Sequence, residues 1–370
     1  MNRTKSFDPL LVLDSISDGV YVTDLDRQIV YWSRSAERIT GWQGADVVGK
    51  HCHDDLLCHI DKDGHQLCGK EYCPLHRAIV SGHQSTASII VFAKGKNGQR
   101  VPMRVTVGPV RDATGQIVGG VETFHDLTQD IHDDERARKI QALTMFRELP
   151  PDGRISFSTH YIPRDIVGGD FHAVTKLSDD RYGFLLADVS GHGVAAALYT
   201  MFLRSLWDTH KELLASPARF AGAMSKSLCG LMKEDSPFAA AICGMVDLGL
   251  GKLCVAGAGN PSPLVFPAGG EPGPVECSGM PLGLFEEAEY SDTYIDFGPG
   301  DRLLLFTDGA TEVTQKDGSM LDSAGLLQCI RSLGYPKCNQ SLKDIELAVL
   351  KASDRIRFDD DLTFLEIARH

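Results

Sequence analysis

The sequence has no excess of basic residues and no long hydrophobic run. Its 37 Lys and Arg residues are outnumbered by 50 Asp and Glu residues, which gives a formal net charge of −13 at pH 7. Nucleic acids and anionic lipids attract basic surfaces, so this charge argues against both as partners. Val194–Leu203, which is ended by Arg204, is too short to span a membrane, and Leu10–Leu13 is too short for a signal-peptide core. We therefore expect a cytosolic, cytoplasmic protein without a membrane or nucleic-acid partner.

Disulfides are not expected either. In a cytosolic protein the ten cysteines serve as free thiols, ligands or sensors rather than as structural bridges. Four of them fall within 22 residues: Cys52, Cys58, Cys68 and Cys73. Their spacing is Cys-x5-Cys-x9-Cys-x4-Cys, which lacks the Cys-x2-Cys pair of most zinc sites. Zinc, an iron–sulfur cluster, thiol redox sensing and simple burial of small side chains all stay open. The cluster is a candidate second metal or redox site.

An acidic residue after a predicted strand marks the first candidate metal site. Asp188 follows the apolar run Phe184–Ala187, which has the length of a buried strand, and precedes a turn at Gly191 and Gly193. A carboxylate at a sheet edge beside a glycine turn suits a hard cation, although an Asp in a strand-to-helix turn is common without one. The site therefore depends on whether other acids join Asp188.

Three further segments supply such acids. Asp170 follows Gly168-Gly169, and Asp308 comes directly after the apolar run Leu303–Thr307. Asp359–Asp361 precede the apolar run Leu362–Ile367. If the last predicted strand runs antiparallel to the other two, these carboxylates gather at one edge, where they repel each other unless a cation neutralises them. A set of oxygen ligands without nearby Cys or His favours Mg²⁺ or Mn²⁺ over zinc.

The first third of the chain is predicted to form a small α+β domain. Strands are expected at Gly19–Thr23, Ile29–Trp32, Ala87–Ala93, Val101–Val110 and Ile117–Leu127, with a short helix at Ala36–Trp42. The segments Asp18–Asp24, Tyr31–Gly41 and Asp126–Thr128 resemble a PAS domain and occur in that family's order. The resemblance implies a signal-sensing or dimerising domain over residues 8–128 and leaves its ligand open.

Residues 129–150 are predicted to form a helical connector. Asp130–Lys139 is highly charged, and Ile131, Ile140, Leu143 and Phe146 form a narrow apolar stripe before Pro150-Pro151. Such a stripe is typical of a coiled coil that pairs two subunits, and it is equally compatible with a solvated linker helix.

Residues 151–370 are predicted to form an α+β layered sandwich, because strands and paired helices are segregated along the chain. The expected strands are Ile155–Tyr161, Tyr182–Ala187, Ala239–Val246, Lys252–Ala256, Tyr294–Phe297, Leu303–Thr307 and Leu362–Ala368. The expected helices are Val194–Leu214, Pro217–Met232, Asp322–Ser332 and Leu342–Ser353.

Six motifs in this part are similar to those of the PPM (protein phosphatase 2C-like) serine/threonine phosphatases, in the SpoIIE/RsbU branch. They are Val167–Phe171, Ala187–Gly193 with Ala195–Leu198, Ala258–Pro261, Gly279–Gly283, Phe306–Glu312 and Asp360–Thr363. The resemblance implies an αββα sandwich with two Mn²⁺ or Mg²⁺ ions at one edge. It also assigns their ligands: Asp170, Asp188 as the bridging and catalytic residue, the Val189 carbonyl, Asp308 and Asp360. Asp360 matches best as the first Asp of Asp-Asp-x-Thr, and Asp361 or Asp359 is the alternative.

The implied activity is hydrolysis of a phosphoserine or phosphothreonine by direct attack of a metal-bound water, under control of the PAS domain. The implied substrate is a phosphorylated bacterial signalling protein of the anti-sigma-factor antagonist type, in a partner-switching pathway. We also expect a homodimer through the PAS domain and connector. The alternative is a catalytically inactive PPM-like binding module that the PAS domain controls.

Overall fold

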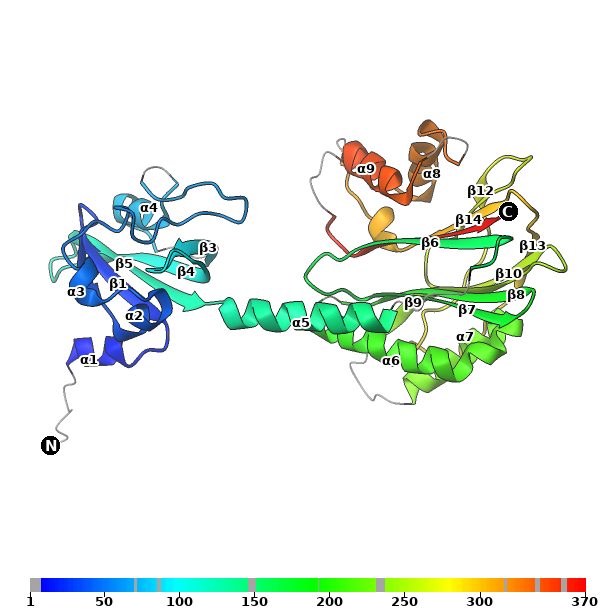
Figure 1. Cartoon of the computed structure of the whole chain (residues 1–370), viewed down its shortest axis with the longest axis horizontal. Coiled ribbons are helices and arrows are strands. Elements are labelled where there is room, and N and C mark those ends of the chain that lie inside the picture. The colour runs from blue at the N-terminus through cyan, green and yellow to red at the C-terminus, as the bar shows by residue number, and fades with distance from the viewer. Residues whose placement is uncertain are drawn as a thin grey trace. The chain divides into compact units, whose positions relative to one another are not determined.

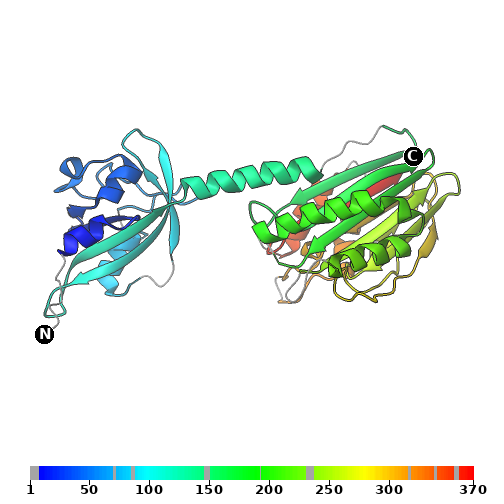
Figure 2. The ribbon, with the colours of Figure 1, turned by 90° about the horizontal axis from the view of Figure 1, so that it is seen from below.

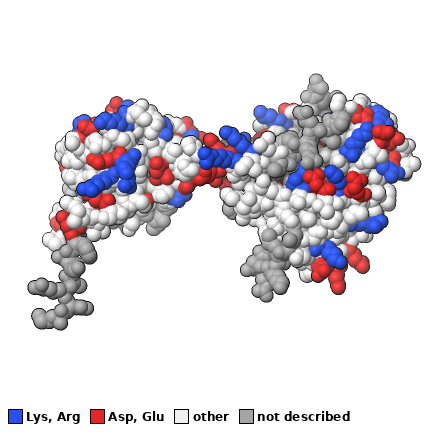
Figure 3. All heavy atoms as spheres, turned by 60° about the horizontal axis from the view of Figure 1, so that its bottom comes forward, with Lys and Arg blue, Asp and Glu red and all other residues white. Residues whose placement is uncertain are grey.

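The structure of the chain is a computed structural model. It describes residues 8–370 except 70–71, 85–87, 146–150, 192, 231–236, 316–317, 337–339 and 354–357. The chain divides into two compact units, residues 1–133 and 134–370. Within the described residues, no helix is long and apolar enough to cross a membrane. On the face that Figure 3 shows, basic and acidic side chains are interspersed.

The first unit is built on one antiparallel sheet of five strands, in the order β2-β1-β5-β4-β3 (Figure 1). The strands are β1 (Gly19–Asp24), β2 (Ile29–Trp32), β3 (Ile89–Lys94), β4 (Arg100–Arg111) and β5 (Ile117–Asp126). The helices are α1 (Pro9–Asp14), α2 (Arg34–Thr40), α3 (Gly44–Val47) and α4 (Pro74–Ser81).

Local signals set the ends of these helices. The Ser33 side chain accepts a hydrogen bond from the Ala36 N–H and so caps α2, which ends at Gly41 with a φ of 76°. The helix α4 packs closely on β5, since a Cβ at Gly120 would lie 2.7 Å from Leu75 and 2.9 Å from Ile79. The central strand β5 therefore has its inner face covered by α4.

The helix α5 (Thr128–Met145) follows β5 and covers most of the predicted connector. Residues 146–150, with Phe146 and the predicted helix end, lie outside the described residues. Ile140 and Leu143 on α5 are exposed, whereas Gln141 between them is buried.

The second unit contains two five-stranded sheets, with strand orders β13-β10-β9-β8-β7 and β12-β11-β14-β15-β6. The strands are β6 (Ile155–Ile162), β7 (Asp170–Ser178), β8 (Arg181–Val189), β9 (Ala239–Asp247), β10 (Lys252–Ala258), β11 (Leu264–Phe266), β12 (Gly273–Pro274), β13 (Thr293–Asp296), β14 (Arg302–Phe306) and β15 (Leu362–Arg369). The helices are α6 (Val194–His210), the 3₁₀ turn η1 (Lys211–Ala215), α7 (Pro217–Cys229), the 3₁₀ turn η2 (Asp308–Ala310), α8 (Ser323–Ser332) and α9 (Leu342–Ser353).

The two sheets face each other across a shared core, and helices cover both outer faces. Phe184, Ile242 and Leu253 of the first sheet belong to one buried cluster with Leu305 and Leu365 of the second. The helices α6 and α7 pack on the first sheet, and α8 and α9 pack on the second (Figures 1 and 2). The predicted αββα sandwich is confirmed. Each large apolar side chain buried in this way contributes about 1.5–3 kcal/mol.

The structure also differs from the expected elements. The predicted helix Val194–Leu214 is α-helical only to His210 and continues as η1, and α7 ends at Cys229 rather than at Met232. The strand β7 was not expected at all. Its first residue is Asp170, so this carboxylate begins a strand rather than lying in a loop.

Candidate metal centre

The pairing of β7 with β8 places two carboxylates together. Asp170 and Asp188 are directly opposite each other in this antiparallel pair, so their side chains lie on the same side of the sheet. Asp170 is only 1% exposed, and Asp188 is half-buried. The pairing extends one residue further, because the Val189 N–H donates to the Gly169 carbonyl at 3.2 Å. Val189 therefore lies at the same sheet end as the two acids.

The second sheet brings two more carboxylates to this edge. Asp308 comes two residues after the end of β14, and Asp360 lies just before β15. These strands are antiparallel, as the predicted site required, and they stay joined beyond their ends, since the Thr307 N–H donates to the Thr363 carbonyl at 3.1 Å. The end of one strand and the start of the other therefore carry acids to one place.

Two threonines connect Asp170 to the second sheet. Thr307 and Thr363 each donate a hydroxyl hydrogen bond to Oδ2 of Asp170, at 3.0 Å and 2.6 Å. The other carboxylate oxygen, Oδ1, is buried and has no hydrogen-bond partner. A buried charged oxygen without a partner is costly, so Oδ1 is the atom that a cation would contact. The sequence prediction missed the two threonines, although both stand beside motif acids.

The electrostatics show that the four acids converge. Burial, followed by the charges of Asp170, Asp308 and Asp360, raises the pKa of Asp188 to about 9. Burial also raises the pKa of Asp170 well above its ordinary value and raises that of Asp308. Asp188 and Asp308 are hydrogen-bonded to each other. Protons offset the repulsion here, and divalent cations would do the same without protonation.

The donor set fits the predicted ions. Every predicted ligand atom is an oxygen, from Asp170, Asp188, Asp308, Asp360 and the Val189 carbonyl, which suits Mg²⁺ or Mn²⁺. The free Oδ1 of Asp170 and the raised pKa values of its neighbours identify the same place. These residues would hold the ions.

The neighbouring Asp360 and Asp361 occupy different environments. Asp361 is buried, and its two oxygens accept backbone hydrogen bonds from Arg164 at 2.7 Å and from Gly169 at 2.6 Å. Asp360 is exposed and interacts electrostatically with Asp188 and Asp308. Asp361 thus holds the segment before Asp170 in place and leaves Asp360 as the ligand candidate.

Two glycines allow this close packing. A Cβ at Gly168 would lie 2.3 Å from the Tyr161 hydroxyl and 2.4 Å from the Asp361 carboxylate, and a Cβ at Gly309 would lie 2.0 Å from the Asp361 carbonyl. Neither space accepts a side chain, which explains why glycine stands at these motif positions.

Comparison with known families agrees with this geometry. Residues 178–370, a little over half of the chain, match the model of the family described as stage II sporulation protein E (SpoIIE). The chain belongs to the SpoIIE family. Residues 8–127 match the PAS fold, which confirms a PAS domain in front of the SpoIIE domain.

Individual relatives resemble different shares of the chain. The phosphoserine phosphatase RsbP of Bacillus subtilis is 27% identical over 183 residues, which cover 49% of this chain and 45% of RsbP. The phosphoserine phosphatase RsbU of the same organism is 22% identical over 263 residues, which cover 67% of this chain and 73% of RsbU. The chain thus spans less than half the length of RsbP. The solved SiaA-PP2C domain of Pseudomonas aeruginosa has a TM-score of 0.54 at 22% identity, over 65% of this chain and 98% of that domain, and supports the fold.

The SpoIIE domain receives a further contact from α5. The buried Gln141 side chain donates from Nε2 to the Gly168 carbonyl at 2.6 Å and to the Thr200 hydroxyl on α6 at 3.3 Å. Its Oε1 accepts from the Gly168 N–H at 3.4 Å. Gly168 lies two residues before Asp170, so the connector helix touches the segment that carries a predicted ligand. No motif of the sequence marks Gln141.

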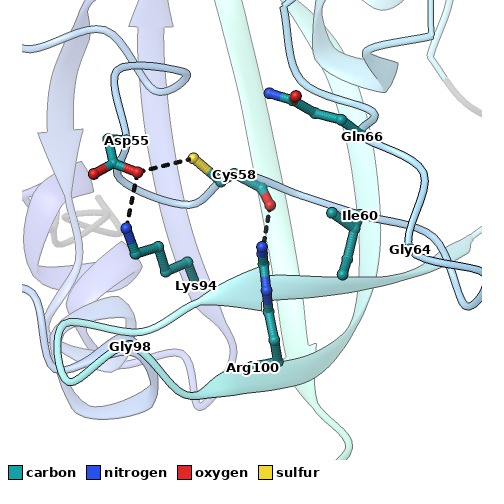
Figure 4. Close-up of a pocket in the computed structure, with 8 residues that line it drawn as sticks. All are labelled: Asp55, Cys58, Ile60, Gly64, Gln66, Lys94, Gly98 and Arg100. Carbon is teal, nitrogen blue, oxygen red and sulfur yellow. Dashed lines mark hydrogen bonds and ion pairs between the residues drawn. The ribbon is translucent and has the colours of Figure 1, made fainter.

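The four predicted cysteines of the PAS domain are not equivalent. Cys52 and Cys73 are buried, and Cys68 accepts a hydrogen bond from the His59 N–H at 3.1 Å. Cys58 has a different setting, with a φ of 39° and its thiol 3.7 Å from Asp55 Oδ1. It lines a surface pocket of about 450 Å³ together with Lys94 and Arg100 (Figure 4).

The charged groups of this pocket already have partners. Lys94 donates to Asp55 at 2.8 Å, and Arg100 donates to the carbonyls of Cys58 at 2.6 Å and Phe92 at 3.3 Å (Figure 4). The contacts hold the loop that carries Cys58 against the β3–β4 hairpin. They give the pocket a structural role.

Proposed function

We propose that the chain is a PAS-regulated, metal-dependent protein phosphatase. Its substrate is a phosphoserine or phosphothreonine on a bacterial signalling protein of the anti-sigma-factor antagonist type, the class that the family resemblance implies. The observation that carries the proposal is the convergence of Asp170, Asp188, Asp308 and Asp360 from two sheets, with the buried Oδ1 of Asp170 free.

The chain's own residues would hold and orient the reacting groups. Asp188 lies opposite Asp170 and hydrogen-bonds to Asp308 of the second sheet, which supports the bridging role that the family resemblance implies for it. Thr307 and Thr363 hydrogen-bond to Oδ2 of Asp170 and leave its Oδ1 free for an ion. Two bound Mn²⁺ or Mg²⁺ ions would supply water activation and neutralise phosphoryl oxygens, for a reaction whose uncatalysed rate is among the slowest known.

The rival function is an inactive binding module of the same fold. The complete set of four carboxylates and the names of RsbP and RsbU, both phosphoserine phosphatases, support the active enzyme. We further propose that the protein is a homodimer through the PAS domain and connector and that this state sets the activity. The contact of Gln141 with Gly168 supports such coupling.

The test measures phosphate release from a phosphoserine protein substrate by the full-length chain. Activity should require Mn²⁺ or Mg²⁺, disappear with a chelator and return when the ion is restored. Asp188→Asn should abolish activity and leave the far-UV circular dichroism unchanged. The matched control is Asp179→Asn, because Asp179 lies on a fully exposed turn of the same domain. Full activity in Asp188→Asn would contradict the metal mechanism, and inactivity of the parent with bound metal would favour the binding module.

A further inference from the structure

The inner face of the PAS sheet carries a polar cluster that the phosphatase function does not use. Glu122 on β5 is 1% exposed, and it lies directly opposite Tyr21 of β1, whose hydroxyl donates to Oε2 at 3.1 Å. His59, which is 3% exposed, approaches from the segment between α3 and α4. A buried acid and a buried imidazole thus share one region of an otherwise apolar core.

The two facing atoms of this pair are unsatisfied. His59 Nε2 lies 3.6 Å from Glu122 Oε1, which is too long for a hydrogen bond, and neither atom has another hydrogen-bond partner. Nearly all buried polar atoms in proteins are paired, and each one left unpaired destabilises the fold. Two such atoms facing each other in a core indicate a missing ligand.

Three thiols surround the same region. The backbone N–H of His59 donates to Cys68 Sγ, and Cys73 precedes the first residue of α4, where its side chain makes no capping hydrogen bond. Cys52 follows His51, which forms an isolated β-bridge with Gln28. The N–H of Cys52 donates to the Arg27 carbonyl at 3.2 Å. Cys52 and Cys68 interact electrostatically with Glu122, with each other and with Cys73. These are soft ligand atoms at the site of the unsatisfied imidazole.

We propose that the PAS domain binds one divalent transition-metal ion of the zinc class through the thiolates of Cys52, Cys68 and Cys73 and Nε2 of His59. Three thiolates and one imidazole form a usual tetrahedral set for structural zinc. No three of these donor atoms lie within 4.8 Å of one another among the described residues, so binding draws the side chains inward. Such movement is ordinary where metal binding is coupled to local folding.

The charges around the site suit this ligand set. Burial raises the pKa of Cys52 far above its ordinary value and that of Cys68 to about 12, so both thiols stay protonated until a cation binds. Burial lowers the pKa of His59 to about 4, which keeps its imidazole neutral and able to ligate. A divalent ion with three thiolates carries one negative charge, and Arg27, whose buried Nη1 has no hydrogen-bond partner, offsets it.

Glu122 completes the site as a neutral neighbour. Burial raises its pKa to about 8, so a protonated Glu122 adds no second negative charge to the core. The exposed group Asp61, Asp63 and His65 is a weaker alternative, although its ligand atoms already lie within 4.8 Å of one another. Its atoms are occupied within their own turn, since Asp61 accepts from the N–H groups of Asp63 and His65 and contacts the His65 ring.

The experiment is metal analysis of the full-length protein, purified without chelator and exchanged into buffer with Mn²⁺. We expect about one zinc ion per chain. Cys68→Ser, Cys73→Ser and His59→Gln should lose most of it, and Glu122→Gln should keep it. Cys58→Ser, the matched control from the same motif, and Asp188→Asn should also keep it. Loss of zinc in either control to the same extent would overturn the assignment.

A second measurement does not depend on the folding of any variant. The parent protein, stripped of zinc and reloaded with Co²⁺, should develop the intense visible and near-ultraviolet absorption of tetrahedral cobalt–thiolate coordination. The oxygen ligands of the SpoIIE domain cannot produce a thiolate band. Absence of both zinc and this band would overturn the proposal, and a brown iron–sulfur chromophore with acid-labile sulfide would overturn the single-ion assignment.

Discussion

Asp360 and Asp361 are adjacent in the chain and chemically identical, so only their surroundings separate their roles. The sequence motif favours Asp360 as the ligand, and the structure adds the reason, because both oxygens of Asp361 accept backbone hydrogen bonds. We therefore expect Asp361 to contribute to stability, and Asp360 stays the predicted metal ligand. A pair of isosteric substitutions distinguishes these roles.

We expect Asp360→Asn to lower kcat with little change in stability. The decrease in kcat should exceed the about 10–100-fold that typically follows loss of a residue that only supports a metal ligand. Asp361→Asn should lower the free energy of unfolding by roughly 1–3 kcal/mol, because an amide nitrogen cannot accept the hydrogen bond from Arg164 or Gly169. Urea unfolding and Mn²⁺ titration of activity measure both effects. The reverse pattern would exchange the two assignments.

The raised pKa of Asp188 predicts how pH affects the metal-free protein. Its pKa is about 9 in the folded chain, against about 3.9 in an unfolded chain. Between these two pKa values, the carboxyl of Asp188 is ionised in the unfolded chain and protonated in the folded chain. The contribution of this group to the free energy of unfolding is therefore complete below about pH 4 and is lost as the pH rises toward 9. This group alone lowers the free energy of unfolding by up to about 1.4 kcal/mol per pH unit.

Urea unfolding in chelator at about pH 6 and about pH 8 checks this expectation. Asp188→Asn should be the more stable protein at the higher pH and should show a smaller loss between the two, since the amide does not titrate. The exposed Asp179→Asn should behave like the parent. Equal slopes in parent and Asp188→Asn would exclude Asp188 as the titrating group.

At the scale of elements, strong apolar runs were predictable and short or polar strands were not. The strands β8, β9 and β15 and the helix α9 were expected within two residues of their bounds, because their buried faces are continuous. The strand β7 was missed, since its second half, Thr175–Ser178, is largely polar and partly exposed and its first residue is a carboxylate. The pairing of β7 with β8 is seen in the structure, and no local sequence pattern indicates it.

The candidate site divides in the same way. Asp188, Asp308 and the group Asp359–Asp361 were candidates because each adjoins an apolar run, which requires only local sequence. The choice of Asp360 within that group came from the family resemblance. The hydrogen bonds from Thr307 and Thr363 to Asp170 join residues 137 and 193 positions apart, so no local pattern reveals them. Gln141 was hidden for the same reason, because its partners Gly168 and Thr200 belong to other elements.

The helix α5 is expected to influence metal binding through Gln141. Gln141→Ala leaves the buried Gly168 carbonyl without its donor, at a cost of about 1–3 kcal/mol, and loosens the segment before Asp170. We expect a several-fold higher Mn²⁺ concentration for half-maximal activity. Gln129→Ala is the control, because Gln129 lies on the same helix and donates to the exposed Asp133. Equal metal dependence in the two variants would remove Gln141 from the site.

At the scale of the whole molecule, the chain carries exposed apolar side chains outside its cores. Ile140 and Leu143 on α5 are 51% and 81% exposed, and Leu10 and Leu11 on α1 are 52% and 61% exposed. Neighbouring exposed large apolar side chains often mark contacts with another chain. Ile140 and Leu143 are three residues apart and therefore neighbours on the surface of α5. The predicted homodimer through the PAS domain and connector would cover these residues.

We therefore expect the full-length protein to sediment as a dimer at micromolar concentration. The double variant Ile140→Glu with Leu143→Glu should shift it toward monomer, because four charges would meet at a two-fold interface, where each side chain contacts its own copy or a near neighbour. Leu347→Glu is the matched control, since Leu347 is 52% exposed on α9. Sedimentation velocity with parallel phosphatase assays measures association and activity together. If the double variant becomes monomeric and its metal-dependent rate changes, the dimer sets the activity. A monomeric parent, or dissociation caused equally by Leu347→Glu, would contradict this interface.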